Sequence, residues 1–432
     1  MFLKSLKVRN LRSIGEVALS FELPEPGGPG ELSGGGSPAV RRNTLLLGEN
    51  GTGKTSLLRA IALITAGSNA LGEILGNPND WVRNGAAACE LEAVLVTAES
   101  EERTLRLRID RDVSLSEIAA QNRESLALLD KALAHADRNY FVVGYGASRR
   151  LNTGESSWYA GSGFYRNPRS GNVATLFNGD APLNSLTAWA VDLDYRTKGG
   201  LAVVREALDD FLPGVTFDSI DKDQKQLLFK TPDGIIPLPQ LSEGYQNMTA
   251  WIGDLLYRVS NTFKDHSNPL QARGLLLIDE IDLHIHPVWQ RHLLAFIEKK
   301  LPRFQIVATT HSPLTAQQAG EGELYTLRRG DGGEVLLVPF AGAPRKMLLH
   351  QLLMTDAFGL ATDESVEVES KKNTYRSLRD KTKRNRKENQ ALKQLSAELK
   401  ELPGPEYSNS LVNPEQMELL MRLTQELQEK RP

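Results

Sequence analysis

A glycine-rich segment at residues 48–55, GENGTGKT, fits the pattern G-x-x-x-x-G-K-[ST]. Glycines let successive backbone N–H groups turn toward phosphate oxygens, and a helix that follows adds the positive end of its dipole. In this pattern Lys54 contacts the β- and γ-phosphates, and the Thr55 hydroxyl is a ligand of Mg²⁺. A short apolar strand at 44–47 and an amphipathic helix at 55–65 flank the segment, as a phosphate-binding loop requires. We therefore predict that ATP and Mg²⁺ are cofactors, bound by Gly48, Asn50, Gly51, Gly53, Lys54, Thr55 and Ser56.

Two acidic residues, Asp279 and Glu280, end the apolar run LLLI at 275–278. Four consecutive apolar residues are typical of a buried strand. At the end of such a strand Asp279 can hold Mg²⁺ through water, and Glu280 can orient the attacking water or accept its proton. The sequence therefore predicts Glu280 and Lys54 as catalytic residues, and Thr55 and Asp279 as the metal site.

His311 ends the next apolar strand, on the side of a parallel sheet where ligands bind. We predict that it senses the γ-phosphate as a third catalytic residue. Upstream, the six residues LSEGYQ that begin at Leu241 precede a predicted helix. They resemble the LSGGQ signature of ABC ATPases, with Glu243 in the position of the first glycine. In that family the equivalents of Ser242 and Gly244 bind the γ-phosphate held by a second subunit.

The segment IDEIDLHIHP at 278–287, together with THSP at 310–313, resembles the RecF/SMC/OLD-like AAA ATPases of the AAA_21-like group. This resemblance covers roughly residues 1–340. It implies an ABC-type P-loop head, with an ATP-dependent head-to-head dimer in which Ser242 and Gly244 act in trans.

Two shorter segments narrow the resemblance. GYGASRR at 144–150 and DAFGL at 356–360 are similar to the PtuA ATPases of Septu anti-phage systems, which act with an HNH nuclease. The resemblance implies an ATP-hydrolysing subunit of a bacterial defence complex that regulates a nuclease or another effector supplied in trans. The interval from Lys54 to Ser242 is too short for the coiled-coil arms of SMC proteins. Because no acidic cluster for a Toprim nuclease follows His311, we expect the nuclease on a separate chain.

Three alternatives to this function stay open. A RecF-like DNA-repair ATPase would bind DNA without a dedicated nuclease, and a membrane-transporter ATPase would require a membrane partner. A third possibility is a sensor that restrains a non-nuclease effector. Two side-chain roles are also open: Arg149 could stabilise phosphate charge or form a structural salt bridge, and His284 with His286 could bind a metal or shape the dimer interface.

The predicted fold class is α/β: a P-loop head with a mixed sheet that has a parallel core, an antiparallel β lobe, a helical insertion and a C-terminal helical tail. From residue 242 onward helices alternate with apolar strands, which predicts a parallel sheet. We expect the head at 1–340, with a helical or irregular insertion at about 111–213. We expect residues 341–432 to form a helical, partly basic region that binds a partner.

Basic residues in this tail recur at steps of three and four, which predicts one basic face on a helix at 371–387. This face could follow DNA phosphates or dock on an acidic partner, or it could simply be solvated. The stripe consists of Lys372, Arg376, Arg379, Lys383 and Arg386. Apolar stripes at 392–399 and 417–427 predict two amphipathic helices, which pack on a partner or on the head.

Composition limits the setting of the protein. The net charge is −3 and there is one cysteine, so any DNA contact needs a local basic patch, and no internal disulfide can form. No apolar run reaches the roughly 18 residues that cross a bilayer. The first four residues lack the layout of a signal peptide. We expect a cytoplasmic protein without a membrane partner.

Overall fold

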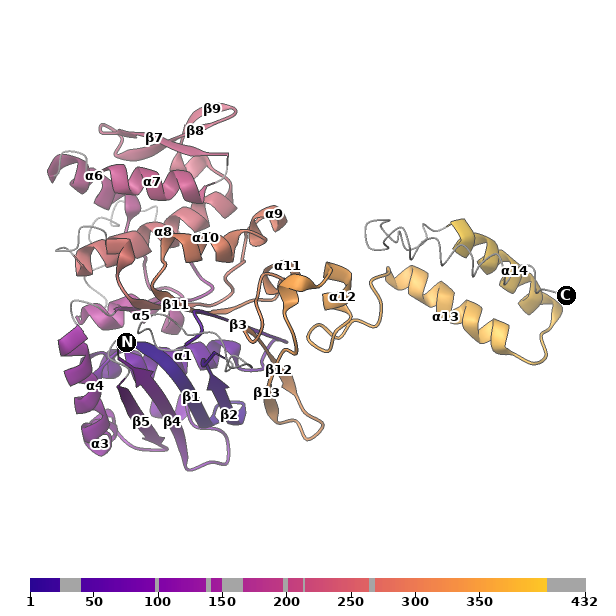
Figure 1. Ribbon diagram of the computed structural model, residues 1–432, viewed down its shortest axis with the longest axis horizontal. Helices are drawn as coiled ribbons and strands as arrows, with labels where there is room; N and C mark the ends of the chain where they lie inside the picture. The colour runs from indigo at the N-terminus through magenta and orange to yellow at the C-terminus, as the bar shows by residue number, and fades with distance from the viewer. Residues whose placement is uncertain are drawn as a thin grey trace, which may run out of the picture. The chain divides into compact units, whose positions relative to one another are not determined.

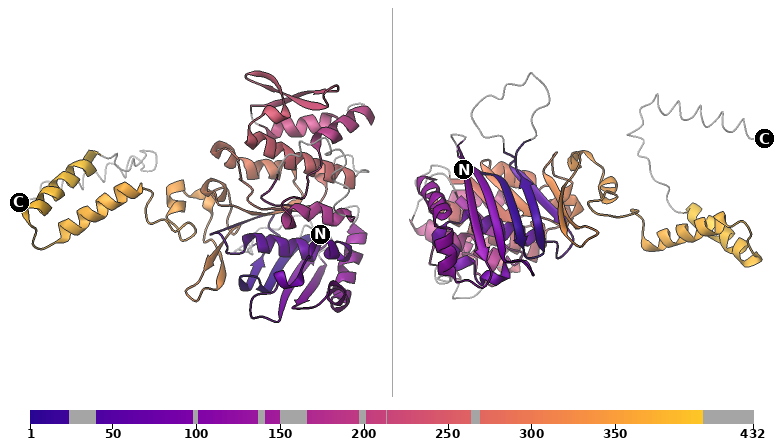
Figure 2. Two further views of the ribbon diagram at one scale, coloured as in Figure 1. Left: turned by 180° about the vertical axis from the view of Figure 1, so that it is seen from behind. Right: turned by 90° about the horizontal axis from the view of Figure 1, so that it is seen from below.

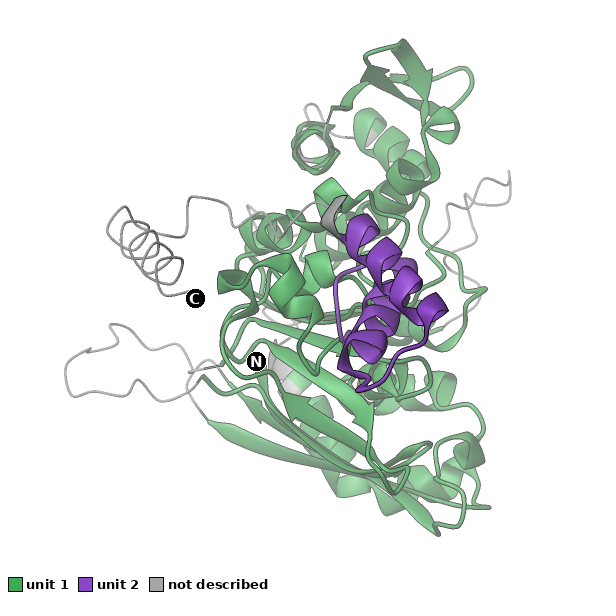
Figure 3. Cartoon of the chain, turned by 90° about the vertical axis from the view of Figure 1, so that its right-hand side faces the viewer, with its two compact units in different colours: residues 1–359 green, residues 360–432 purple. Residues whose placement is uncertain are grey.

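The chain forms two compact units, residues 1–359 and 360–432 (Figure 3). The computed structural model describes residues 1–23, 40–97, 101–136, 141–149, 166–196, 201–212, 214–263 and 269–401. The glycine-rich stretch at 24–37 and the predicted helix at 417–427 lie outside the described residues.

A six-stranded sheet forms the middle layer of the first unit (Figure 1). Its spatial order is β6 (Phe141–Tyr145), β10 (Gly274–Ile278), β11 (Phe304–Thr309), β3 (Asn43–Gly48), β12 (Leu324–Arg329) and β13 (Val335–Pro339). Neighbouring strands run parallel except β13, which pairs antiparallel with β12. All residues of β10 are buried, because both faces of a parallel sheet are covered. The parallel core predicted for the sheet is confirmed.

A second, antiparallel sheet has the order β2 (Ile14–Ser20), β1 (Phe2–Leu11), β4 (Ala88–Val96) and β5 (Glu102–Asp110), and its strands lie side by side in the right-hand view of Figure 2. Apolar and polar residues alternate along β5, so one face is buried and the other meets solvent. On the solvent face oppositely charged side chains pair across neighbouring strands. We call this set the charge ladder; it consists of Lys7, Arg9, Glu16, Glu90, Glu92, Arg106, Arg108 and Asp110.

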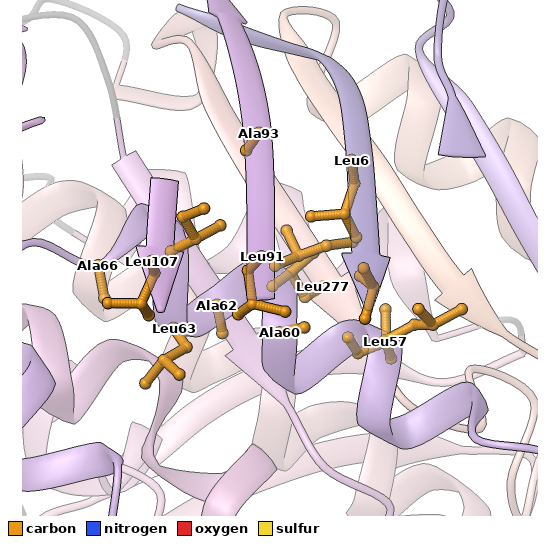
Figure 4. Packing of buried hydrophobic residues seen from close by; sticks show 14 of the residues in the cluster. Leu6, Leu57, Ala60, Ala62, Leu63, Ala66, Leu91, Ala93, Leu107 and Leu277 are labelled. Atoms are coloured by element: carbon orange, nitrogen blue, oxygen red, sulfur yellow. The ribbon is translucent and has the colours of Figure 1, made fainter. Parts of the chain in front are cut away.

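Helix α1 (Lys54–Thr65) contacts strands of both sheets. In Figure 4 its Leu57 and Leu63 lie among Leu6 and Leu91 of the antiparallel sheet, with Leu277 of β10 nearby. The sequence predicted an apolar stripe on one side of this helix. The structure buries ten of its twelve residues, because two layers cover it.

Gln305 of β11 joins the two sheets directly. Its Oε1 accepts a hydrogen bond from the Leu3 backbone N–H at 2.8 Å, and its Nε2 donates to the Leu3 carbonyl at 2.8 Å. A buried backbone N–H and C=O must find partners, and near the start of β1 this one side chain supplies both. The contact fixes how β1 lies against the parallel sheet.

Several helices lie within residues 111–213, where a helical or irregular insertion was expected. Residues 168–177 form helix α5 (Pro168–Phe177). Its start has a physical explanation, because Pro168 occupies the first turn and the Asn167 side chain accepts a hydrogen bond from the Arg169 N–H at 2.8 Å. The other helices in this range are α3 (Leu115–Gln121), α4 (Arg123–Ala136), α6 (Leu186–Arg196) and α7 (Leu201–Phe211), whereas α2 (Ser68–Ile74) comes before β4.

The far face of the parallel sheet is covered by a second hydrophobic core. Helix α8 (Glu243–Thr262) and helix α10 (Leu293–Lys300) lie on it, and α6, α7 and a three-stranded sheet lie farther out (Figure 1). That sheet consists of β7 (Thr216–Asp221), β8 (Gln226–Thr231) and β9 (Gly234–Pro237). With the two sheets and the helical tail described below, the predicted fold class is confirmed.

The second unit contains helices α13 (Val366–Asp380) and α14 (Arg386–Glu401), which contact each other. The prediction of one continuous basic face is wrong, because α13 ends at Asp380 and a turn separates it from Lys383 and Arg386. Part of the basic charge is also paired within the unit: Lys371 contacts Glu398 of α14 at 3.2 Å. Among the described residues no helix is long and apolar enough to cross a membrane.

Candidate nucleotide-binding site

The glycine-rich loop connects β3 to α1 at the edge where the parallel strands end. Gly48 and Gly53 have φ angles of 153° and 98°, which disfavour any residue with a side chain. A Cβ on Gly48 would also collide with the backbone carbonyl of Leu327 in β12. Gly51 has φ 77°, and a Cβ there would meet no atom within 4 Å. The loop is thus tight against the sheet at Gly48 and open at Gly51, beside the exposed Asn50.

Lys54 is the first residue of α1, and its side chain turns back into this loop. Its Nζ donates hydrogen bonds to the carbonyls of Gly48 at 2.7 Å and Glu49 at 2.9 Å. Burial lowers the pKa of Lys54, while the nearby Asp279 and Glu280 oppose that shift. A buried ammonium whose hydrogen bonds go to neutral carbonyls fits an anionic ligand such as a phosphate chain.

Asp279, which follows β10, is held by two hydroxyl groups. Thr55 Oγ1 of α1 donates to its Oδ2 at 2.7 Å, and Thr309 Oγ1 of β11 donates to its Oδ1 at 2.6 Å. A hydroxyl and a carboxylate at this distance are the hard oxygen donors that Mg²⁺ prefers, so the residues fit the predicted ion. Ser56, the next residue of α1, is buried in the first turn.

Glu280 is fixed through its backbone. Its N–H donates to Thr309 Oγ1 at 2.7 Å, and its φ of 48° lies in the left-handed region. Such a conformation is uncommon for a residue with a side chain and persists only where the surroundings impose it. Thr309 therefore holds the carboxylate of one acidic residue and the amide of the next.

Arg149, in the loop that follows β6, imposes the same geometry from the other side. Its Nη1 donates to the Asp279 carbonyl at 2.8 Å and its Nη2 to the Glu280 carbonyl at 2.6 Å. The side chain is 4% exposed, and burial lowers its pKa to about 10, so it is a cation at neutral pH. These hydrogen bonds of Arg149 go to two backbone carbonyls rather than to a carboxylate, so the side chain positions the backbone that carries both acidic residues.

The segment after β11 folds around a third acid, Asp282. Its Oδ2 accepts hydrogen bonds from Thr310 Oγ1 at 2.9 Å and from the Ser312 N–H at 3.1 Å. Between these two residues stands His311, which is exposed on the side of the cluster. Burial and then the Lys54 charge lower the pKa of His311, while Glu280 opposes that shift. His311 is therefore neutral at pH 7 and can act as a hydrogen-bond partner.

Ser242 and Gly244 line a separate pocket of about 400 Å³. Ser242 is exposed at the N-terminus of α8, and a Cβ on Gly244 would lie 2.7 Å from the carbonyl of His284. Glycine is therefore needed where α8 passes the loop that follows β10. Tyr245 and Trp289 meet edge to face on the pocket wall, with ring centroids 5.3 Å apart.

His284 and His286 lie on the wall of this pocket. The Nδ1 of His286 accepts a hydrogen bond from the Val288 N–H at 3.3 Å, so it caps the short helix α9 (Pro287–Gln290). Across the described ranges, no group of three or more His, Cys, Asp or Glu side chains could hold a metal ion.

The structure brings together most of the predicted residues in one cluster, and Ser242 and Gly244 in the other pocket. Sequence reasoning missed Thr309 and Asp282, and it missed the backbone role of Arg149. The signal for Thr309 was a polar residue at the buried end of an apolar strand. No short-range signal pointed to Arg149, which lies 130 residues before Asp279.

Residues 181–316 match the family model described as "AAA domain, putative AbiEii toxin, Type IV TA system". Among curated proteins, Septu protein PtuA of Bacillus mycoides is 25% identical over 83% of this chain and 45% of its own length. The chain resembles AAA-type ATPases and PtuA, as its motifs predicted. The Escherichia coli protein named Retron Ec83 probable ATPase is 32% identical over 30% of this chain and 24% of its own length. The chain spans less than half the length of these curated relatives.

Among solved structures, the SMC head domain from Thermotoga maritima aligns with 79% of this chain and 99% of its own, at 13% identity and a TM-score of 0.42. The recombination mediator protein RecF aligns with 79% of this chain and 98% of its own, at 13% identity and a TM-score of 0.42.

Proposed function

We propose that the chain is an ATP-hydrolysing subunit of a bacterial anti-phage defence complex. The observation that carries this proposal is the joint anchoring of the two acids after β10: Thr55 and Thr309 hold the Asp279 carboxylate, and Thr309 and Arg149 hold the Glu280 backbone. Similarity to Septu PtuA and to a retron ATPase supports the defence setting.

In the proposed reaction the glycine-rich loop and Lys54 bind the phosphate chain of ATP. Mg²⁺, when bound, would neutralise phosphate charge beside Thr55 and Asp279. Glu280 orients the attacking water and accepts its proton, and His311 donates or accepts a hydrogen bond at the γ-phosphate. Because Arg149 and Thr309 fix the Glu280 backbone, the carboxylate needs little rearrangement before reaction.

We also propose that two copies associate around ATP, with Ser242 and Gly244 of one copy contacting the nucleotide of the other. Two features support this proposal. Ser242 is exposed at the start of the 20-residue helix α8, whose N-terminus favours an anion. These residues also line a pocket separate from the Lys54 cluster, as expected if they serve a second copy.

The proposed partner is a nuclease of the HNH type, or another effector, on a separate chain. ATP binding or hydrolysis in the dimer would regulate this partner. Because the chain as a whole carries a net charge of −3, any direct contact with DNA would be made by a local basic patch.

Purified protein should hydrolyse ATP in a Mg²⁺-dependent manner, and Lys54→Ala should abolish binding or turnover. Glu280→Gln should retain ATP and accumulate as a dimer in size-exclusion chromatography with light scattering. Two exposed residues give matched controls: Lys346→Ala and Glu321→Gln should turn over ATP like the parent chain. Normal turnover by Lys54→Ala would contradict the assignment of the ATP site. Normal turnover by Glu280→Gln would show that Glu280 does not activate the attacking water.

A tagged pull-down from the native cell, with and without ATP, tests the partner. Stoichiometric recovery of a nuclease is the expected result, and Glu280→Gln should raise its yield if ATP-bound dimers recruit it. Recovery with recombination proteins only, together with binding to gapped DNA, would instead support a DNA-repair function.

A further inference from the structure

The middle of α8 carries a buried charged cluster that none of the roles above uses. Asp254 is fully buried, and four hydrogen bonds reach its carboxylate. Its Oδ2 accepts from Tyr145 Oη at 2.8 Å and from Arg258 Nε at 2.5 Å. Its Oδ1 accepts from the Asn184 N–H at 2.8 Å and from the Asn184 side-chain amide at 2.6 Å. The carboxylate is therefore fully satisfied and locked in one orientation.

Tyr145 connects this cluster to the candidate nucleotide site. It is the last residue of β6 and pairs with Ile278 of β10. Its carbonyl accepts a hydrogen bond from the Asp279 N–H at 2.8 Å. One residue thus contacts Asp279 with its backbone and Asp254 of α8 with its side chain. Four residues later Arg149 binds the carbonyls of Asp279 and Glu280.

The same residue also packs on α8. The Tyr145 ring lies 5.7 Å from that of Trp251, one turn before Asp254, and both side chains are buried. On the other side Arg258 Nη1 donates to the Asn172 side chain of α5 at 2.9 Å. Movement of α8 along its axis would therefore break charged hydrogen bonds at several points, rather than slide over an apolar surface.

We propose that Tyr145 and Asp254 are positioning residues that couple the Asp279–Glu280 strand end to the N-terminus of α8. A helix of this length is a rigid rod, so a shift at Asp254 is transmitted to Ser242 three turns earlier. The binding of ATP beside Asp279 would thereby set the position of the surface offered to the second copy. The inference rests on the proposed function, because it assigns Ser242 to the nucleotide of that second copy.

Tyr145→Phe tests the coupling with a minimal change. It removes only the hydroxyl, and Asp254 keeps Arg258 and Asn184 as partners, so the helix stays folded. We expect the affinity for a fluorescent ATP analogue, measured with protein too dilute to dimerise, to stay within about twofold of the parent. We expect kcat to fall about tenfold and the ATP dependence of turnover to lose its cooperativity. Tyr257→Phe, on the same helix, is the matched control and should behave like the parent chain.

Hydrogen–deuterium exchange separates this inference from the proposed function. In a Glu280→Gln background ATP should slow exchange in residues 48–56 and in residues 243–250. Adding Tyr145→Phe should keep the first effect and abolish the second, and Asp254→Asn should weaken the second. If ATP does not slow exchange at 48–56 in the Glu280→Gln protein that retains Tyr145, the proposed ATP site itself is wrong. Equal protection of 243–250 with and without the Tyr145 hydroxyl would overturn the coupling alone.

Discussion

Replacement of Thr309 by valine tests whether one hydroxyl organises both acidic residues. Valine has nearly the same shape, so the change removes two hydrogen bonds at a fully buried site without leaving a cavity. A hydrogen bond to a charged group contributes about 1.5–3 kcal/mol, and a buried N–H left unpaired costs about 1–3 kcal/mol. Because relaxation recovers part of this sum, we expect the free energy of unfolding to fall by about 3 kcal/mol.

In the unit formed by residues 1–359, a loss of about 3 kcal/mol corresponds to a fall in Tm of roughly 4 °C. The effect on turnover should be larger, since a displaced Glu280 misorients the attacking water and about a hundredfold loss in kcat is expected. The assays are thermal unfolding and steady-state ATP hydrolysis. Thr309→Ser retains the hydroxyl and should stay within about threefold of the parent in kcat. A Thr309→Val protein with parental Tm and kcat would refute the assigned role of this hydroxyl.

Three further predictions concern single residues. Gly244→Ala should bind ATP normally but lose about tenfold in turnover, because the new Cβ would lie 2.7 Å from the His284 carbonyl. Gly72→Ala, whose Cβ would meet no atom within 4 Å, is the control in the same kinetic assay. Iodoacetamide at pH 8 should not modify Cys89 until the protein is unfolded in urea, because burial raises the pKa of its thiol to about 12; rapid labelling of the native chain, detected by mass spectrometry, would contradict that burial. Turnover should be constant above pH 7 and decline only below about 6.5, the ordinary pKa of histidine. The reason is that burial and the Lys54 charge lower the pKa of His311 and keep the side chain neutral. In a pH–rate profile, His311→Gln should flatten that decline.

The parts of the fold that rest on local patterns were predictable from the sequence. The apolar run before Asp279 and the glycines before Lys54 are contiguous, and their chemistry requires a strand end and a helix start. The alternation of helices and apolar strands gave the parallel core in the same way. Prediction of these features does not require knowing which strands become neighbours in the sheet.

Strand order is the information that local patterns lack. Thr309 reaches Asp279 because β11 lies between β3 and β10 in the sheet, which no periodicity encodes. Arg149 likewise depends on β6 pairing with β10. Helix α5 is a local feature by contrast, because Asn167 and Pro168 form a helix start that can be read from the sequence.

The charge ladder on the antiparallel sheet has a consequence for long-range recognition. It contains four basic and four acidic side chains, which form ion pairs across neighbouring strands and, at Arg108 and Asp110, along one strand. Opposite charges a few ångströms apart produce fields that cancel within about one Debye length, near 8 Å at physiological salt. The charge ladder therefore neither attracts nor repels an approaching polyanion or polycation until the two surfaces almost touch. Exposed ion pairs of this kind add little to the stability of the fold. Their main physical effect is that this broad face has almost no long-range electrostatic potential in solution.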